Sequence, residues 1–164
     1  MEAYPLAWPA HRPRRKASER VRGDFSETVA GSAKSRPVSV STAYDRLERQ
    51  VELLGGVYFL LSTNLELRKD GVPRRDRGSP ADPGACVYFQ LKGSPYALAC
   101  DTYTDVGQNI AALANHIDAL RRQERYGVAT AAESLRAWGW PQELPASDCW
   151  WRKGCRVLAL LEPE

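Results

Sequence analysis

Residues 83–101 constrain the fold more than any other part of this sequence, because they have the pattern of a β-hairpin with one apolar face. A four-residue turn at 92–95 would set Leu91 opposite Tyr96 and separate two runs of alternating side chains. One face would then carry the core residues Val87, Phe89, Leu91, Tyr96, Leu98 and Cys100. The other would carry Cys86, Tyr88, Gln90, Ala97, Ala99 and Asp101.

Helical periodicity flanks this hairpin on both sides. Residues 43–54 follow a hydroxyl cap at Ser41 or Thr42 and precede Gly55, which ends a helix. A second helix begins after a cap at Thr104 or Asp105 and continues to residue 125. A shorter helix follows at 129–138, and residues 57–67 are β-prone and predict either one long strand with a bend near 62–63 or two short strands. This order predicts an α+β fold with a small antiparallel sheet built around a central β-hairpin, packed against two or three helices.

The composition divides the chain into three parts. Residues 1–38 form a basic arm rich in Pro, Arg and Ser, with eight basic and four acidic side chains, and we expect it to be partly disordered. Residues 39–141 form the α+β core domain, and residues 142–164 form a Trp-rich tail. Within the arm, Tyr4, Leu6 and Trp8 are costly to leave in water, so we expect them to dock on the folded body or on a partner.

The chain has no apolar run of the roughly 18 residues that a membrane span needs, and its first residues lack the apolar region of a secretory signal. We therefore expect a cytoplasmic protein. The four cysteines include no Cys-x-x-Cys pair, and the two histidines lie far from them in sequence. We expect reduced thiols, no metal and no cofactor.

Six segments in order resemble a family of uncharacterised bacterial and phage proteins that are often labelled J-domain-containing. They are YPLAWP at 4–9, STNLELRKDGVP at 62–73, DPGACVYF at 82–89, ACD at 99–101, NI at 109–110 and LRRQERYG at 120–127. The resemblance implies the fold of that family's N-terminal domain and a bacterial or mobile-element origin.

The chain departs from that family at its C-terminal part. In the family, a stretch similar to Trp150-Trp151 opens a J domain, which stimulates an Hsp70 ATPase through a His-Pro-Asp motif. This sequence has no His-Pro-Asp, so the resemblance does not imply a co-chaperone activity.

Three groups of residues are candidates for function. A polar face on or beside the sheet would bind a partner through Asn64, Arg68, Asp70, Tyr88 and Asp101. Basic side chains that could meet a phosphate backbone are Arg12, Arg14, Arg15, Lys16, Lys69, Arg74, Arg75 and Arg77. Aromatic side chains that could dock on another protein are Trp8, Trp150 and Trp151.

We expect a non-enzymatic accessory protein of bacterial or phage origin that acts through contacts with another protein. Sequence-independent binding of nucleic acid is a first alternative. A second is a metal-dependent nuclease, in which Asp82 and Gln90 would supply oxygen ligands to Mg²⁺ and Lys92 would lie near the attacking water.

Overall fold

The computed structural model describes residues 3–10, 12–28, 31, 33–68, 73–74 and 80–136. These residues form an α+β fold, as predicted, with two small antiparallel sheets. The elements in chain order are η1 (Ala17–Glu19), β1 (Ser26–Thr28), β2 (Ser35–Pro37), α1 (Val40–Leu54), β3 (Val57–Thr63), β4 (Ala85–Leu91), β5 (Ser94–Cys100), α2 (Val106–Arg125) and α3 (Ala131–Arg136).

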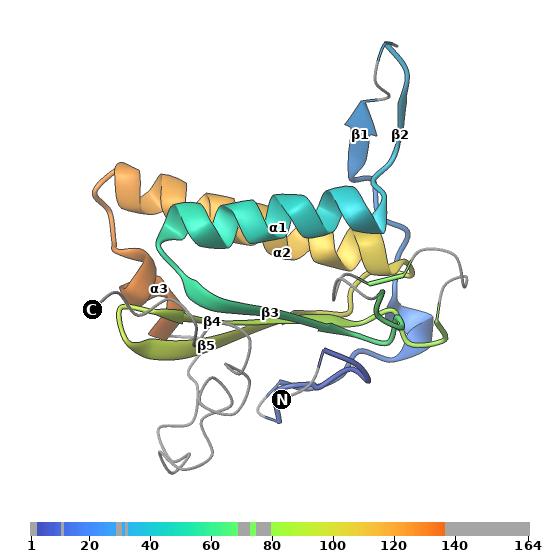
Figure 1. Cartoon of the computed structure of the whole chain (residues 1–164), viewed down its shortest axis with the longest axis horizontal. Coiled ribbons are helices and arrows are strands. Elements are labelled where there is room, and N and C mark those ends of the chain that lie inside the picture. Colours follow the sequence, from blue (N-terminus) through green and yellow to red (C-terminus); the bar gives the residue numbers. More distant parts are fainter. Residues whose placement is uncertain are drawn as a thin grey trace, which may run out of the picture.

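The larger sheet has the order β3-β4-β5, so the first strand of the predicted hairpin is its central strand. Helices α1 and α2 lie side by side over one face of this sheet, and the N-terminal segment crosses the other face (Figure 1). The two helices run in the same direction, because Ser39 and Asp105, which precede them, line one cleft. Near their other ends, Arg121 donates a hydrogen bond to Gln50.

The face assignment of the hairpin is confirmed, but the predicted register is wrong. Leu91 lies opposite Ser94 rather than Tyr96. This difference shifts β5 by two residues along β4, and because side chains alternate with a period of two, each residue keeps its face. The helices therefore cover the predicted core residues Val87, Phe89, Leu91, Tyr96, Leu98 and the partly buried Cys100.

The turn is shorter than predicted for a conformational reason. Lys92 and Gly93 have φ angles of 50° and 81°, so both occupy the left-handed region. Two successive residues of this kind make the tight turn whose twist matches that of the flanking strands. Ser94 and Pro95 consequently belong to β5 instead of the loop.

Helix α1 begins earlier than we predicted from the hydroxyl residues at 41 and 42. Its cap is Ser39, whose side chain accepts a hydrogen bond from the backbone N–H of Thr42. The predicted end at Gly55 is confirmed, with Gly55 in the left-handed conformation. Helix α2 has the predicted bounds and is capped by Asp105, which accepts a hydrogen bond from the backbone of Gln108.

Strand β3 ends at Thr63, where the bend was predicted, so one long strand through residue 67 does not form. Asn64 and Arg68 therefore lie beyond the strand. Near its start, the pairing with β4 shifts between Val57 and Leu60, and Tyr58 has a φ of 57°. This is the geometry of a β-bulge.

The smaller sheet is a two-stranded ribbon, β1 and β2, that projects away from the body (Figure 1). Beyond the ribbon and η1, the described residues of the arm are mostly irregular. No helix in the described part of the chain is both long and apolar enough to cross a membrane.

Candidate functional site

The face of the sheet opposite the helices is covered by the chain's own N-terminal segment. Cys86, Tyr88, Ala97 and Ala99 form a second apolar cluster on this face. Four partly buried residues pack against this cluster, namely Leu6, Ala7, Trp8 and Leu60. The expected docking of Leu6 and Trp8 on the folded body is confirmed, whereas Tyr4 remains 45% exposed.

Side chains of the sheet hold the backbone of this segment. Asn64 accepts a hydrogen bond from the Leu6 backbone N–H at 3.0 Å, and Ser62 accepts one from the Ala7 N–H at 2.8 Å. The Tyr88 hydroxyl donates to the Ala7 carbonyl at 2.9 Å. Two residues of the predicted polar face, Asn64 and Tyr88, are thus engaged with the arm.

Two carboxylates anchor the next part of the arm. Asp101, another residue of the predicted face, is buried, accepts a hydrogen bond from the Arg15 backbone N–H at 2.8 Å and forms an ion pair with Arg14 Nε at 3.1 Å. Asp82 forms ion pairs with Arg14 and Arg20. These ion pairs join the Asp82 carboxylate to two guanidinium groups of the arm, so they hold the arm against the body.

Burial in the apolar cluster raises the pKa of two polar groups within it. Burial raises the pKa of the Cys86 thiol to about 12. Burial, with Cys86 beside it, also raises the pKa of the Tyr88 hydroxyl above its usual range. Both groups are therefore protonated at neutral pH, and Cys86 is an unreactive thiol while the arm covers it.

Of the remaining residues of the predicted polar face, Arg68 is not brought to this cluster. Arg68 is exposed, beyond the end of β3 and next to the bridge between Leu67 and Pro73. Asp70 lies outside the described residues.

The basic residues proposed for nucleic acid fall into different environments. Arg14 is used in the ion pairs with Asp82 and Asp101, Arg12 is partly buried, and Arg15 and Lys16 are exposed. Arg74 is partly buried, with its backbone N–H bonded to the Glu66 carbonyl. Lys69, Arg75 and Arg77 lie outside the described residues, as do Trp150 and Trp151 of the docking group.

The three residues of the nuclease hypothesis do not converge. Asp82 precedes β4, whereas Gln90 and Lys92 lie at its other end, where Gln90 donates a hydrogen bond to the Gly93 carbonyl. Strands rise about 3.3 Å per residue, so the part of β4 from Ala85 to Gln90 alone spans roughly 16 Å. Among the residues that the structure describes, no group of three His, Cys, Asp or Glu side chains is arranged to hold a metal ion.

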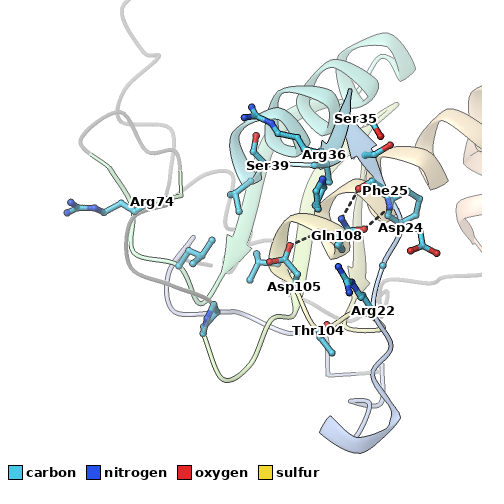
Figure 2. A pocket seen from close by; sticks show the side chains of 18 residues that line it. Arg22, Asp24, Phe25, Ser35, Arg36, Ser39, Arg74, Thr104, Asp105 and Gln108 are labelled. Atoms are coloured by element: carbon cyan, nitrogen blue, oxygen red, sulfur yellow. Dashed lines mark hydrogen bonds between the residues drawn. The ribbon is translucent and has the colours of Figure 1, made fainter. Parts of the chain in front are cut away.

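A cleft of about 990 Å³ lies at the base of the β1–β2 ribbon, where α1 and α2 begin (Figure 2). Its apolar lining comes from Val38, Val40, Leu65 and Val106. Its polar lining includes Arg22, Asp24, Ser26, Ser35, Arg36, Ser39, Thr104, Asp105 and Gln108. Arg74 also contributes, and Figure 2 shows its side chain pointing away from the other labelled residues.

Gln108 fixes one wall of the cleft. Its side-chain amide accepts a hydrogen bond from the Phe25 N–H at 2.9 Å and donates one to the Phe25 carbonyl at 2.8 Å, as a neighbouring strand would (Figure 2). Gly23 permits this close approach, because a Cβ at that position would lie 2.8 Å from Cδ of Gln108. The wall is therefore a rigid part of the body.

A buried carboxylate fixes the ribbon to α1 beside the cleft. Glu27 pairs with Arg36 at 2.6 Å and accepts hydrogen bonds from the backbone and side chain of Ser39. A hydrogen bond with Thr42, followed by those with Ser39 and Arg36, lowers the pKa of Glu27 from 4.5 to about 2 against the opposing effect of burial. The cluster therefore requires an ionised Glu27.

Sequence patterns gave no indication of the cleft, because it joins residues 22–26 to residues 35–40 and 104–108. The role of Ser62 could have been found from its alternation with Asn64.

A scan against protein-family models, a search of curated proteins and a search of solved structures each found no significant match to the chain.

Proposed function

We propose that this protein is a non-enzymatic accessory protein that binds a segment of another protein in the cleft at the base of the β1–β2 ribbon. The cleft carries this proposal. Its volume lies at the upper end of the roughly 300–1,000 Å³ typical of ligand sites, and it combines an apolar lining with hydroxyl, amide and guanidinium groups. The bacterial or phage origin is part of the proposal and rests on the sequence resemblance alone.

The arrangement of the lining suits an extended polypeptide. The half-buried Val40 offers apolar contact area beside the buried Val38, Leu65 and Val106, while the exposed hydroxyl groups of Ser35 and Thr104 offer partners for a main chain. Arg22 adds an exposed cationic group that binds carboxylates, whereas Arg36 is paired with Glu27, and Asp24 and Asp105 add negative charge. A partner segment with alternating apolar and charged side chains fits this chemistry.

Site-specific photo-crosslinking tests the proposal. A photoreactive residue at Ser35, in the cleft, is compared with one at Asn115, on the exposed side of α2, in extracts of the native host. We expect a protein adduct at Ser35 that Thr104→Trp abolishes by filling the cleft and that the control Asn115→Trp leaves intact. Equal adducts at both positions would contradict the proposal. So would a metal-dependent turnover of nucleic acid that Asp82→Ala or Asp101→Ala removes.

Sequence-independent binding of nucleic acid is a second candidate, favoured by the exposure of Arg15, Lys16 and Arg22 along the arm. Binding of this kind weakens steeply with salt, because phosphate contacts release counterions. A titration of single- and double-stranded DNA at several salt concentrations measures that slope. Neutralising these three residues should reduce the slope by about three units, and an unchanged slope would exclude them as phosphate contacts.

A further inference from the structure

The face of the sheet opposite the helices holds the N-terminal segment mainly by its main chain. Besides the bonds from Asn64, Ser62 and Tyr88, the Thr63 backbone N–H donates to the Ala3 carbonyl at 3.0 Å. These four bonds reach backbone atoms of the segment, so they do not depend on its side chains. Residues 3–6 form a turn, and another segment that follows the same path can make the same bonds.

Side-chain selection on this face comes from the apolar cluster. Cys86, Ala97 and Ala99 are small, so the segment lies close to the strands, with Leu6 and Trp8 on either side of Ala7. The Trp8 indole donates to the Arg12 carbonyl at 2.8 Å, and the Arg14 guanidinium lies 4.1 Å from its ring centre. The face therefore favours the order aliphatic, small, tryptophan.

Release of this segment does not require the body to unfold. Leu6, Ala7 and Trp8 are only partly buried. The arm remains attached further along, where Val21 forms two backbone hydrogen bonds, with Thr102 and Thr104. Exchange of this segment for another that follows the same path replaces each lost contact with an equivalent one.

We propose that this face is a peptide-binding groove that its own N-terminal segment occupies, and that a partner protein binds there by displacing it. The partner presents a segment with an aliphatic residue, a small residue and a tryptophan in succession, preceded by a turn as in residues 3–6. This groove is separate from the cleft at the ribbon base, and each site can be tested while the other is intact.

Thiol labelling of Cys86 reports whether the groove is covered, since Cys86 is fully buried beneath the segment. In the full-length chain, Trp8→Ala should raise the rate of maleimide labelling at Cys86 by about tenfold or more, because it weakens the cover. Mass spectrometry of the fragment that contains Cys86 separates its labelling from that of the other cysteines. Tyr4→Ala is the control, because Tyr4 lies in the same segment but outside the cluster.

A synthetic peptide with the sequence of residues 3–16 then tests binding in trans. It should bind the Trp8→Ala chain in a fluorescence anisotropy titration, about fivefold or more tightly than the wild-type chain, whose groove is filled. It should also restore the protection of Cys86. The same peptide with Asp in place of Leu6 and Ala in place of Trp8 should do neither.

Tyr88→Phe is a second, milder variant in case Trp8→Ala misfolds. It removes only the hydroxyl that donates to Ala7 and keeps the ring. It should raise Cys86 labelling with an unchanged far-ultraviolet circular dichroism spectrum. Failure of the peptide to bind or protect in both variants overturns the proposal. If protection of Cys86 in the wild-type chain instead rises with protein concentration alongside dimer formation, the displacing segment comes from a second copy, and the proposal is wrong.

Discussion

At the scale of single residues, Asn109 connects more of the structure than its size suggests. It is fully buried in α2, and its side-chain N–H groups donate to the carbonyls of Pro83 and Tyr103 at 2.8 and 2.9 Å. Its side-chain oxygen accepts from the Tyr103 N–H and from Cys100. One amide thus joins the loop before β4, the end of β5 and the start of α2.

Replacing Asn109 with alanine should lower the free energy of unfolding by about 2–4 kcal/mol, because several buried backbone groups would lose their partner. Urea denaturation measures this change. The matched control is Asn115→Ala on the exposed side of the same helix, which should change stability by less than about 0.5 kcal/mol. Equal effects of the two substitutions would show that the bonds of Asn109 contribute little.

The ionised Glu27 should make the free energy of unfolding depend on pH. Its pKa is lowered on folding from 4.5 to about 2. The unfolded state therefore binds a proton first, and the stability from the ionised group is fully present above about pH 5 and is lost as the pH falls toward 2. Thermal melts of the wild-type chain and of Glu27→Gln should differ most at neutral pH and converge near pH 2. A constant difference over that range would contradict the prediction.

At the scale of the elements, the β4–β5 turn is the part most open to a direct test. Gly93 occupies the left-handed region with a φ of 81°, where a Cβ is strained. Gly93→Ala should reduce the free energy of unfolding by about 1 kcal/mol, although an added Cβ has open space around it.

Lys92→Asn should stabilise the turn, because asparagine tolerates the left-handed conformation that Lys92 adopts. Urea denaturation midpoints with unchanged slopes would measure both effects.

Periodicity in the sequence predicted the elements well where local chemistry decides them. Helix α2 has the predicted bounds because its apolar spacing, the cap Asp105 and the last-turn residue Arg125 agree. The cap of α1 was misplaced because hydroxyl residues stand at 39, 41 and 42, and contacts with Glu27 select Ser39. The bulge at Tyr58 was missed because its sequence carries no glycine to mark it.

The candidate site was predictable only in part. The docking of Leu6 and Trp8 followed from the cost of exposing them, and alternation in the hairpin placed Tyr88 on the correct face. The partners of Asp82 and Asp101 could not be predicted, because they lie more than 60 residues away in the arm. Any of several arginines in that arm could have paired with these carboxylates.

At the scale of the whole molecule, Asp82 links parts of the chain that are distant in sequence. It pairs with Arg14 and Arg20 of the arm and accepts a hydrogen bond from Asn64 at 3.1 Å. Asp82→Asn removes the charge but retains the shape. We expect it to loosen the arm and leave the body folded.

Limited trypsin digestion measures that loosening. Cleavage after Arg14 and Arg15 should become about three- to tenfold faster in Asp82→Asn, because local opening exposes the arm. The control Asp118→Asn removes ion pairs with Arg121 and Arg122 that lie within α2, and it should leave cleavage of the arm unchanged. If trypsin cleavage at sites in α2 became faster by the same factor, Asp82→Asn would have unfolded the whole molecule. That result would contradict the prediction that the arm loosens while the body stays folded.

The shared direction of α1 and α2 gives the molecule an electrical polarity. Aligned peptide dipoles place partial positive charge at the cleft end and partial negative charge at the far end, where Arg122 and Arg125 lie in the last turn of α2. Side chains of opposite sign compensate this backbone polarity, because the carboxylate of Asp105 caps the start of α2 and the two arginines lie at its other end.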